Sequence, residues 1–292
     1  MESIDGQDDA RVVVLGLQHL AGCLALSKSA KWNQNEADWR LMLGFGRGWG
    51  VSMPDGTLAA STLVLPYGAK FAWVAMVLVL PEHRRKGYAT QLLRVALAEL
   101  RKQAQTPILD ATPDGHEVYV QEGFRDTWGF RRYVLRKKKN STEGKIQTRP
   151  ITDSDWPQIL RLDARAFGAS REILLKNLAA RLPEAALVAK RRGQITGFVL
   201  GRDGREAKQV GPLIARDEKT ASALLAAAVG RTRSPVYVDI ADHAADLQSW
   251  AQAQGFAFQR PFTRMVHGAG PEPAHAPGDA SLVYCPAGPE LG

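Results

Sequence analysis

Residues 77–90 combine residue types that could bind an anion. An apolar run ends at Pro81, and a basic stretch, Arg84 to Lys86, then stands directly before Gly87 and an amphipathic helical pattern. The N-terminus of a helix has unpaired N–H groups and a partial positive charge. A glycine there lets an anion approach the backbone closely. The segment therefore predicts a phosphate or pyrophosphate site.

Other common ligand motifs do not fit the sequence. Residues 77–90 lack the Gly-x-x-x-x-Gly-Lys-Ser/Thr spacing of a P-loop, and the glycines between Gly44 and Gly50 stand before a predicted strand, which is the wrong order for dinucleotide binding. We interpret those glycines as a flexible connection. The six histidines show no HExxH or similar spacing, so we predict no metal. Cys23 and Cys285 are far apart and fit no disulfide or metal pattern.

The elements needed to position the basic loop can be predicted on both sides of it. The apolar run 71–80 predicts a strand that is buried on both faces. At ten residues it is too short to cross a bilayer, which takes about 20. Residues 88–103 predict a helix, because leucines and alanines recur on one face at helical spacing.

The order of predicted elements occurs twice in the chain. The pair Leu92–Leu93 and the pair Leu224–Leu225 are 132 residues apart, and so are Gly123–Phe124 and Gly255–Phe256. One offset across two separate elements indicates a duplicated domain. We predict a first domain over residues 1–137, a polar linker over 138–145, a second domain over 146–267 and a C-terminal tail over 268–292.

The segment around the basic loop resembles the acetyl-CoA-binding motif of the GNAT acetyltransferase superfamily, whose core reads Gln/Arg-x-x-Gly-x-Gly/Ala. Arg84, Gly87 and Ala89 fill those positions. The closing residues 287–292 are similar to those of a bacterial two-domain subgroup. The resemblance implies an α+β fold of two tandem GNAT-like domains, each with a central mixed, mostly antiparallel sheet flanked by helices.

The resemblance also implies roles for individual residues. Tyr119, which precedes a Gly-Phe pair as in the family, would donate a proton to the departing CoA thiolate. Backbone groups at the end of the apolar strand would contact the pantetheine arm, and N–H groups of the basic loop would hold the pyrophosphate. The implied cofactor-binding residues are Val77, Leu78, Val79, Arg84, Arg85, Lys86, Gly87, Tyr88, Ala89 and Thr90.

The acceptor side has weaker signals. Four residues near the second predicted helix could line an acceptor pocket: Trp32, Asn33, Gln34 and Glu36. The alternatives are a packed connection between helices and, for Glu36, a solvated helix face. No single residue is indicated as the general base, and the candidates are Glu36, Asp38, Asp110 and His116.

The second copy departs from the motif. With the offset of 132, Lys219 stands at the position of Gly87 and Ala251 at that of Tyr119, and the acidic pair Asp217–Glu218 precedes Lys219. A long side chain and negative charge would oppose a pyrophosphate. We therefore predict that the second domain is non-catalytic and shapes the acceptor site, an interface or a dimer.

Composition excludes several classes of protein. With 45% hydrophobic and 23% charged residues, the chain is neither disordered nor collagen-like. The net charge of +8 would help to steer a polyanionic ligand. Its densest point, residues 131–139, could bind nucleic acid, but we interpret it as a solvated strand end that leads into the linker. The polar, acidic start lacks a signal-peptide pattern, which favours a cytoplasmic protein with no membrane partner.

The resemblance predicts an acetyl-CoA-dependent N-acetyltransferase. A primary amine of a small molecule or peptide would attack acetyl-CoA directly in a ternary complex in the first domain, and a homodimer is compatible with this interpretation. The alternative is a non-catalytic acyl-CoA-binding or sensing protein whose second domain docks a partner.

Overall fold

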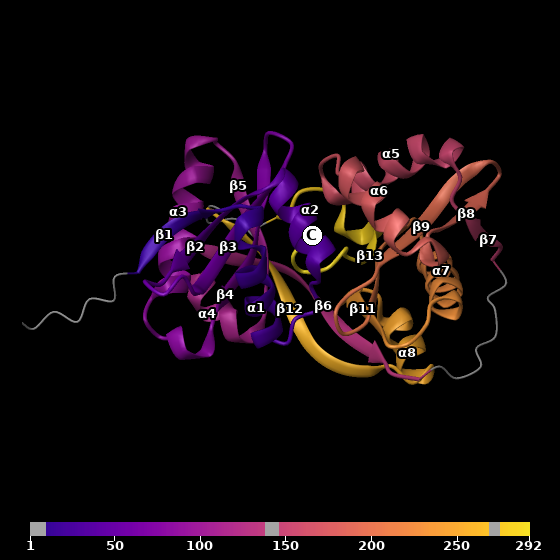
Figure 1. Ribbon diagram of the computed structural model, residues 1–292. Coiled ribbons are helices and arrows are strands. Elements are labelled where there is room, and N and C mark those ends of the chain that lie inside the picture. Colours follow the sequence, from indigo (N-terminus) through magenta and orange to yellow (C-terminus); the bar gives the residue numbers. More distant parts are fainter. Residues whose placement is uncertain (1–9, 138–145, 269–274) are drawn as a thin grey trace, which may run out of the picture.

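The computed structural model describes residues 10–137, 146–268 and 275–292 (Figure 1). The first half consists of β1 (Arg11–Leu15), α1 (Leu20–Ser29), α2 (Glu36–Phe45), β2 (Arg47–Ser52), β3 (Leu58–Tyr67), β4 (Phe71–Val79), α3 (Tyr88–Lys102), β5 (Thr106–Ala111), α4 (Pro113–Gln121) and β6 (Phe124–Leu135). The strand predicted at 71–80 and the helix predicted at 88–103 are confirmed as β4 and α3.

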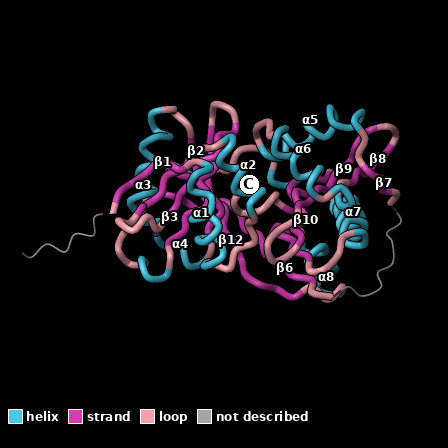
Figure 2. Tube along the Cα trace, viewed as in Figure 1, coloured by secondary structure: helices cyan, strands magenta, loops and turns pink. Residues whose placement is uncertain are grey.

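The second half repeats this order and adds one short strand. It consists of β7 (Thr148–Pro150), α5 (Trp156–Phe167), α6 (Glu172–Arg181), β8 (Leu187–Arg191), β9 (Gln194–Arg202), β10 (Lys208–Ala215), α7 (Glu218–Arg231), β11 (Val236–Ala241), α8 (Ala245–Ala253), β12 (Ala257–His267) and β13 (Val283–Cys285). The predicted mixed α and β architecture is confirmed, with helices outside the strands in both halves (Figure 2).

One sheet connects the two halves, because each contributes a strand to the other. The strand order is β1-β2-β3-β4-β5-β12-β6-β11-β10-β9-β8-β7, with β13 paired to β10. β12 of the second half lies between β5 and β6, antiparallel to both, and β6 of the first half pairs with β11. The sheet thus joins in space the two halves whose boundaries we predict at residues 137 and 146 (Figure 1).

The sheet of the first half is covered on both faces because its strands alternate apolar side chains between two cores. Leu63 and Leu65 belong to the core that includes α1 and α2. Val64 and Val74 belong to the core that includes the apolar face of α3. Burial on both sides explains why residues 71–80 read as a continuous apolar run, as predicted. The two layers hold β4 and α3, and therefore the loop between them, in fixed positions.

The chain ends inside the protein, between the two halves (Figure 1). The hydroxyl of Tyr67 donates to the carbonyl of Leu291 at 2.8 Å, and the indole Nε1 of Trp73 donates to the carbonyl of Pro289 at 2.9 Å. Residues 282–287 are buried. Part of the predicted tail is thus built into the core, and residues 269–274 lie outside the described residues.

Asp38 is buried where α2 meets the second half, and it does not lie in the cleft described below. Its two carboxylate oxygens accept from Arg181 and Arg202, each at 2.6 Å. One of these oxygens also accepts from the backbone N–H of Asn35 at 2.9 Å. These contacts give Asp38 a structural role, joining two arginines of the second half to a helix of the first.

We expect Asp38→Asn to lower the free energy of unfolding by about 3–5 kcal/mol, because two guanidinium groups each lose one of their two carboxylate partners. Urea unfolding measures this change. The matched control is Glu36→Gln on the same helix, because within the described residues Glu36 pairs with Arg40 alone and both side chains are exposed. The control should change stability by less than about 1 kcal/mol. Equal losses in the two variants would contradict the role assigned to Asp38.

Candidate active site

A cleft opens where β4 and β5 separate. The two parallel strands pair only from Phe71↔Thr106 to Trp73↔Ile108. From there β5 continues along β12, whereas the facing edge of β4 has no paired strand among the described residues. A bulge helps to turn β4 away: Met76 has φ +52°, and the hydroxyl of Ser61 donates to its carbonyl at 2.8 Å.

The cleft has a volume of about 760 Å³ and extends from β4 to the N-terminus of α3 and to α4. Nine of the ten residues predicted to bind the cofactor line it: Val77, Leu78, Val79, Arg84, Arg85, Gly87, Tyr88, Ala89 and Thr90. Lys86 is not a lining residue. The cleft thus combines an apolar strand edge with a basic loop.

The loop at residues 80–87 presents its backbone to the cleft. Arg85 and Gly87 have φ of +62° and +82°, and Gly87 is the N-cap of α3. A Cβ built on Gly87 would meet no heavy atom within 4 Å, so this position faces open space. Positive φ next to ordinary backbone turns successive N–H groups toward one concavity, which favours an anion.

Tyr119 of α4 also lines the cleft and is half-buried. Its ring packs edge-on against Phe124, with 5.9 Å between centroids. Among the described residues the Tyr119 hydroxyl has no hydrogen-bond partner, so it is available to a ligand. Burial raises the pKa of Tyr119 above its ordinary value of about 10. The phenol therefore stays protonated at neutral pH, as a proton donor requires.

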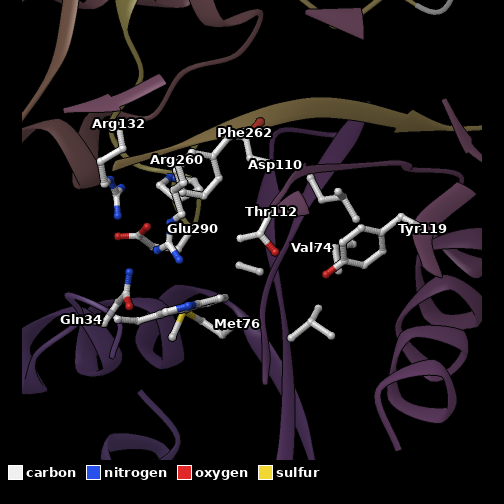
Figure 3. A pocket seen from close by; sticks show the side chains of 15 residues that line it. Gln34, Val74, Met76, Asp110, Thr112, Tyr119, Arg132, Arg260, Phe262 and Glu290 are labelled. Carbon is white, nitrogen blue, oxygen red and sulfur yellow. The ribbon is translucent and has the colours of Figure 1, made fainter. Parts of the chain in front are cut away.

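A small cavity of about 30 Å³ lies at the inner end of the cleft (Figure 3). The cavity and the cleft lie side by side, because they share six lining residues: Trp32, Val77, Asp110, Thr112, Tyr119 and Arg260. Arg132 of β6, Phe262 of β12 and Glu290 of the C-terminal segment also line the cavity. Both halves thus build its wall.

The corresponding place in the second half is closed. Only Arg216 and Asp217 lie between β10 and α7, so the basic loop has no counterpart there. The predicted match of Gly87 with Lys219 is therefore wrong: Gly87 is the N-cap of α3, whereas Asp217 is the N-cap of α7, so the offset of 132 does not hold across this shorter connection. The Asp217 carboxylate caps α7 by accepting from the backbone N–H of Thr220 at 2.8 Å. β13 pairs with β10, so this strand edge is covered as well.

Two family models match the sequence, one in each half of the chain. A model described as the acetyltransferase (GNAT) family matches residues 18–124, and a model described as an acetyltransferase (GNAT) domain matches residues 159–277. The chain is a tandem GNAT acyltransferase. The family implies acetyl-CoA as co-substrate, and the open apolar strand edge, the glycine at positive φ and the adjacent arginines suit its pantetheine and pyrophosphate groups.

The similarity of this tandem GNAT protein to its relatives covers most of the chain. The uncharacterized N-acetyltransferase YitH of Bacillus subtilis (strain 168) is 22% identical over 247 residues, or 84% of this chain and 87% of that protein. A candidate acetyltransferase of Pyrococcus horikoshii superposes with a TM-score of 0.78 at 18% identity, over 100% of this chain and 99% of the other. A tandem GNAT protein from the clavulanic acid biosynthesis pathway superposes with a TM-score of 0.64 at 17% identity, over 90% of this chain and 100% of the other. At these identities the structures show a shared fold.

The residues predicted for the acceptor side of this GNAT protein separate into two groups. Trp32 and Gln34 line the small cavity. Asn33 instead bonds to the second half: its Oδ1 accepts from the backbone N–H groups of Glu206 and Ala207 at 2.8 and 3.0 Å. Glu36 lies on the exposed face of α2, outside the cavity.

The remaining candidates for the base have partners already. Arg264 holds Asp110 through two bonds of 2.9 and 3.0 Å, and burial raises the pKa of Asp110. His116 pairs with Asp126 at 2.8 Å near the surface. In the described ranges there is no cluster of three potential metal ligands. Across the same ranges, no helix has the length and apolar character needed to cross a membrane.

Arg260 and Glu290 were not among the predicted site residues. Arg260 stands in an apolar strand pattern and Glu290 in the last six residues, both more than 130 positions after Tyr119. No local pattern marks either position, because Arg260 shares its strand with a second arginine, Arg264, and Glu290 is a single charged residue in its segment. Their position in the same cavity as Tyr119 depends on the exchanged strand and on the buried C-terminal segment.

Proposed function

We propose that the first half of the chain transfers the acetyl group of acetyl-CoA to a primary amine of a small molecule or peptide, by direct attack in a ternary complex. The observation that carries this proposal is the open β4–β5 cleft, which joins the basic loop at one end to Tyr119 at the other. Its counterpart in the second half is closed by β13 and Asp217, which supports catalysis in the first half only.

Each part of the cleft has a defined task in this reaction. The free backbone edge at residues 77–79 pairs with the pantetheine arm and holds the acetyl group at the inner end. N–H groups of residues 85–90 hold the pyrophosphate. Holding both reactants together can supply up to about 7–11 kcal/mol of the barrier. Tyr119 donates its proton to the sulfur as the C–S bond breaks, which is typically worth about 10²–10⁴-fold.

The second half has a supporting role in this proposal. It supplies β12 and the C-terminal segment to the wall of the cavity, and its own helix terminus is capped from within. A role in dimer formation also fits the non-catalytic half.

We expect Asp217→Ala to lower stability by about 1 kcal/mol through loss of the helix cap, with turnover unchanged. Thermal unfolding and thiol release measure the two effects separately. A tenfold loss of turnover in the folded variant would contradict the assignment of catalysis to the first half.

The proposal is tested by measuring thiol release from acetyl-CoA with amino acids, polyamines, aminoglycosides and short peptides. An amine whose addition causes thiol release, and whose mass rises by about 42 Da because an acetyl group replaces one hydrogen, supports it. Acetyl-CoA that binds without thiol release across the whole panel would count against it.

A further inference from the structure

The small cavity presents buried polar atoms that have no partner among the described residues. They are the carboxylate oxygen Oε2 of Glu290, the amide oxygen Oε1 of Gln34 and the guanidinium Nε of Arg260. Glu290 and Gln34 are each only 2% exposed. An unpaired buried polar group costs about 1–3 kcal/mol, and more when charged. Such atoms around one cavity therefore point to a ligand that pairs with them.

Glu290 is held so that one oxygen is committed and the other is free. Its Oε1 forms an ion pair with Arg202. The guanidinium of Arg202 also pairs with the carboxylate of Asp38, at 2.6 Å. The neighbouring Arg132 is committed to Asp239 through bonds of 2.7 and 2.6 Å. The Oε2 atom of Glu290 therefore remains free to accept a hydrogen bond from a ligand.

Gln34 adds a second acceptor beside this carboxylate. Figure 3 shows Glu290 between the amide of Gln34 and the guanidinium of Arg132, on the opposite side of the cavity from Tyr119. Unpartnered acceptors on two residues that line one small cavity suit a group with several N–H donors and a positive charge. A primary ammonium group has three such donors.

Arg260 supplies the opposite charge. It comes from β12, lies over the ring of Phe262 with 5.1 Å between the guanidinium carbon and the ring centroid, and has no ion pair within the described part of the chain. Burial and the nearby Arg132 lower the pKa of Arg260, so an anion beside it would be favoured. Arginine binds carboxylates through parallel N–H donors.

We propose that this cavity binds the head of a small amine that also carries an anionic group, as an amino acid does, with the ammonium group at Glu290 and Gln34 and the anion at Arg260. The inference rests on the proposed function and specifies its acceptor class. It also makes the second half part of the active site, because Arg260 and Glu290 both come from it.

The proton balance of the reaction follows from this placement. The ammonium group gives one proton to Glu290, and the nitrogen lone pair then forms the C–N bond. The C–S bond breaks, and its electron pair goes to sulfur, which takes the proton of Tyr119. The amide nitrogen returns its extra proton to the Tyr119 phenolate, and Glu290 releases one proton to water. The products are the N-acetyl amine, CoA and that one proton.

The first experiment measures binding without turnover. Calorimetry on the full-length protein saturated with CoA compares three matched pairs: glycine with glycinamide, β-alanine with β-alaninamide, and L-lysine with cadaverine. We expect the carboxylate-bearing member to bind at least tenfold more tightly in at least one pair. Equal binding within every pair, or no binding of any member, would overturn the proposal.

Variants identify the two ends of the site. In the pair that the wild type distinguishes, Arg260→Gln should bring the ratio of the two affinities close to one. Glu290→Gln should lower the affinity for both members of that pair at least tenfold. Because Glu290→Gln removes a partner from Arg202 and could impair folding, Gln34→Ala serves as a second variant at the ammonium end. Arg47→Gln is the matched control, because Arg47 pairs with Glu99 and lies over the ring of Trp49, away from the cavity. Unchanged selectivity in Arg260→Gln would overturn the anion site.

The outcome also separates this inference from the proposed function. Selective binding with no thiol release from acetyl-CoA would refute acetyl transfer and leave the binding site intact. Thiol release with no preference within any pair would refute the acceptor class and leave acetyl transfer intact.

Discussion

We expect Gly87→Glu to lower the affinity for acetyl-CoA at least a hundredfold. Gly87 is the N-cap of α3 at φ +82°, and its missing side chain faces the cleft. A glutamate would place a carboxylate where the pyrophosphate is proposed to bind. The negative charge would compete for the helix N-terminus and repel the phosphates. Calorimetric titration with acetyl-CoA measures the loss.

The matched control for this variant is Gly56→Glu. Gly56 has φ +86° and also faces open space, but it lies in the turn between β2 and β3. Both variants carry the same unfavourable backbone conformation, which costs about 1–3 kcal/mol. Both should therefore lose similar stability, and only Gly87→Glu should lose affinity. Unchanged affinity in a folded Gly87→Glu variant would refute the pyrophosphate position.

The second large effect is expected for Tyr119→Phe. Turnover should fall about 10²–10⁴-fold, because the departing sulfur loses its proton donor. Affinity for acetyl-CoA should change little, since the ring and its packing on Phe124 remain. Because burial raises the pKa of Tyr119, the wild-type phenol keeps its proton to a higher pH than an exposed tyrosine. We therefore expect no loss of turnover from ionisation of Tyr119 below about pH 10.

Steady-state thiol release over a range of pH, together with acetyl-CoA titration, checks this prediction. Tyr284→Phe is the control, because Tyr284 is a buried tyrosine whose pKa is also raised by burial but lies on β13 of the second half. It should retain full turnover. If Tyr119→Phe kept wild-type turnover, another group would have to protonate the sulfur.

Features that depend on neighbouring residues could be predicted from the sequence. The apolar run of β4, the spacing in α3 and the basic loop before Gly87 all lie within 20 consecutive residues or so, and together they located the cleft. The duplicated order of elements was equally visible, because each element has its own periodicity.

Features that depend on pairing between distant segments could not be predicted. The alternation in β12 indicates a strand but does not show that it lies between β5 and β6. The roles of Asn33 and Asp38 were missed for a similar reason, since their partners lie in the other half. Arg260 and Glu290 share a cavity only because of these long-range contacts.

The exchange of β6 and β12 has a consequence for how the protein is made. During synthesis, residues 11–135 emerge long before residues 257–267, yet β5 and β6 pair with β12 and not with each other. The nascent first half therefore has one edge of β5 and both edges of β6 unpaired, because β11 and β12 are made later. Such edges promote association with other chains. The β4–β5 cleft borders this gap. The walls of the cleft and of the small cavity are thus complete only after residues 257–290 have left the ribosome.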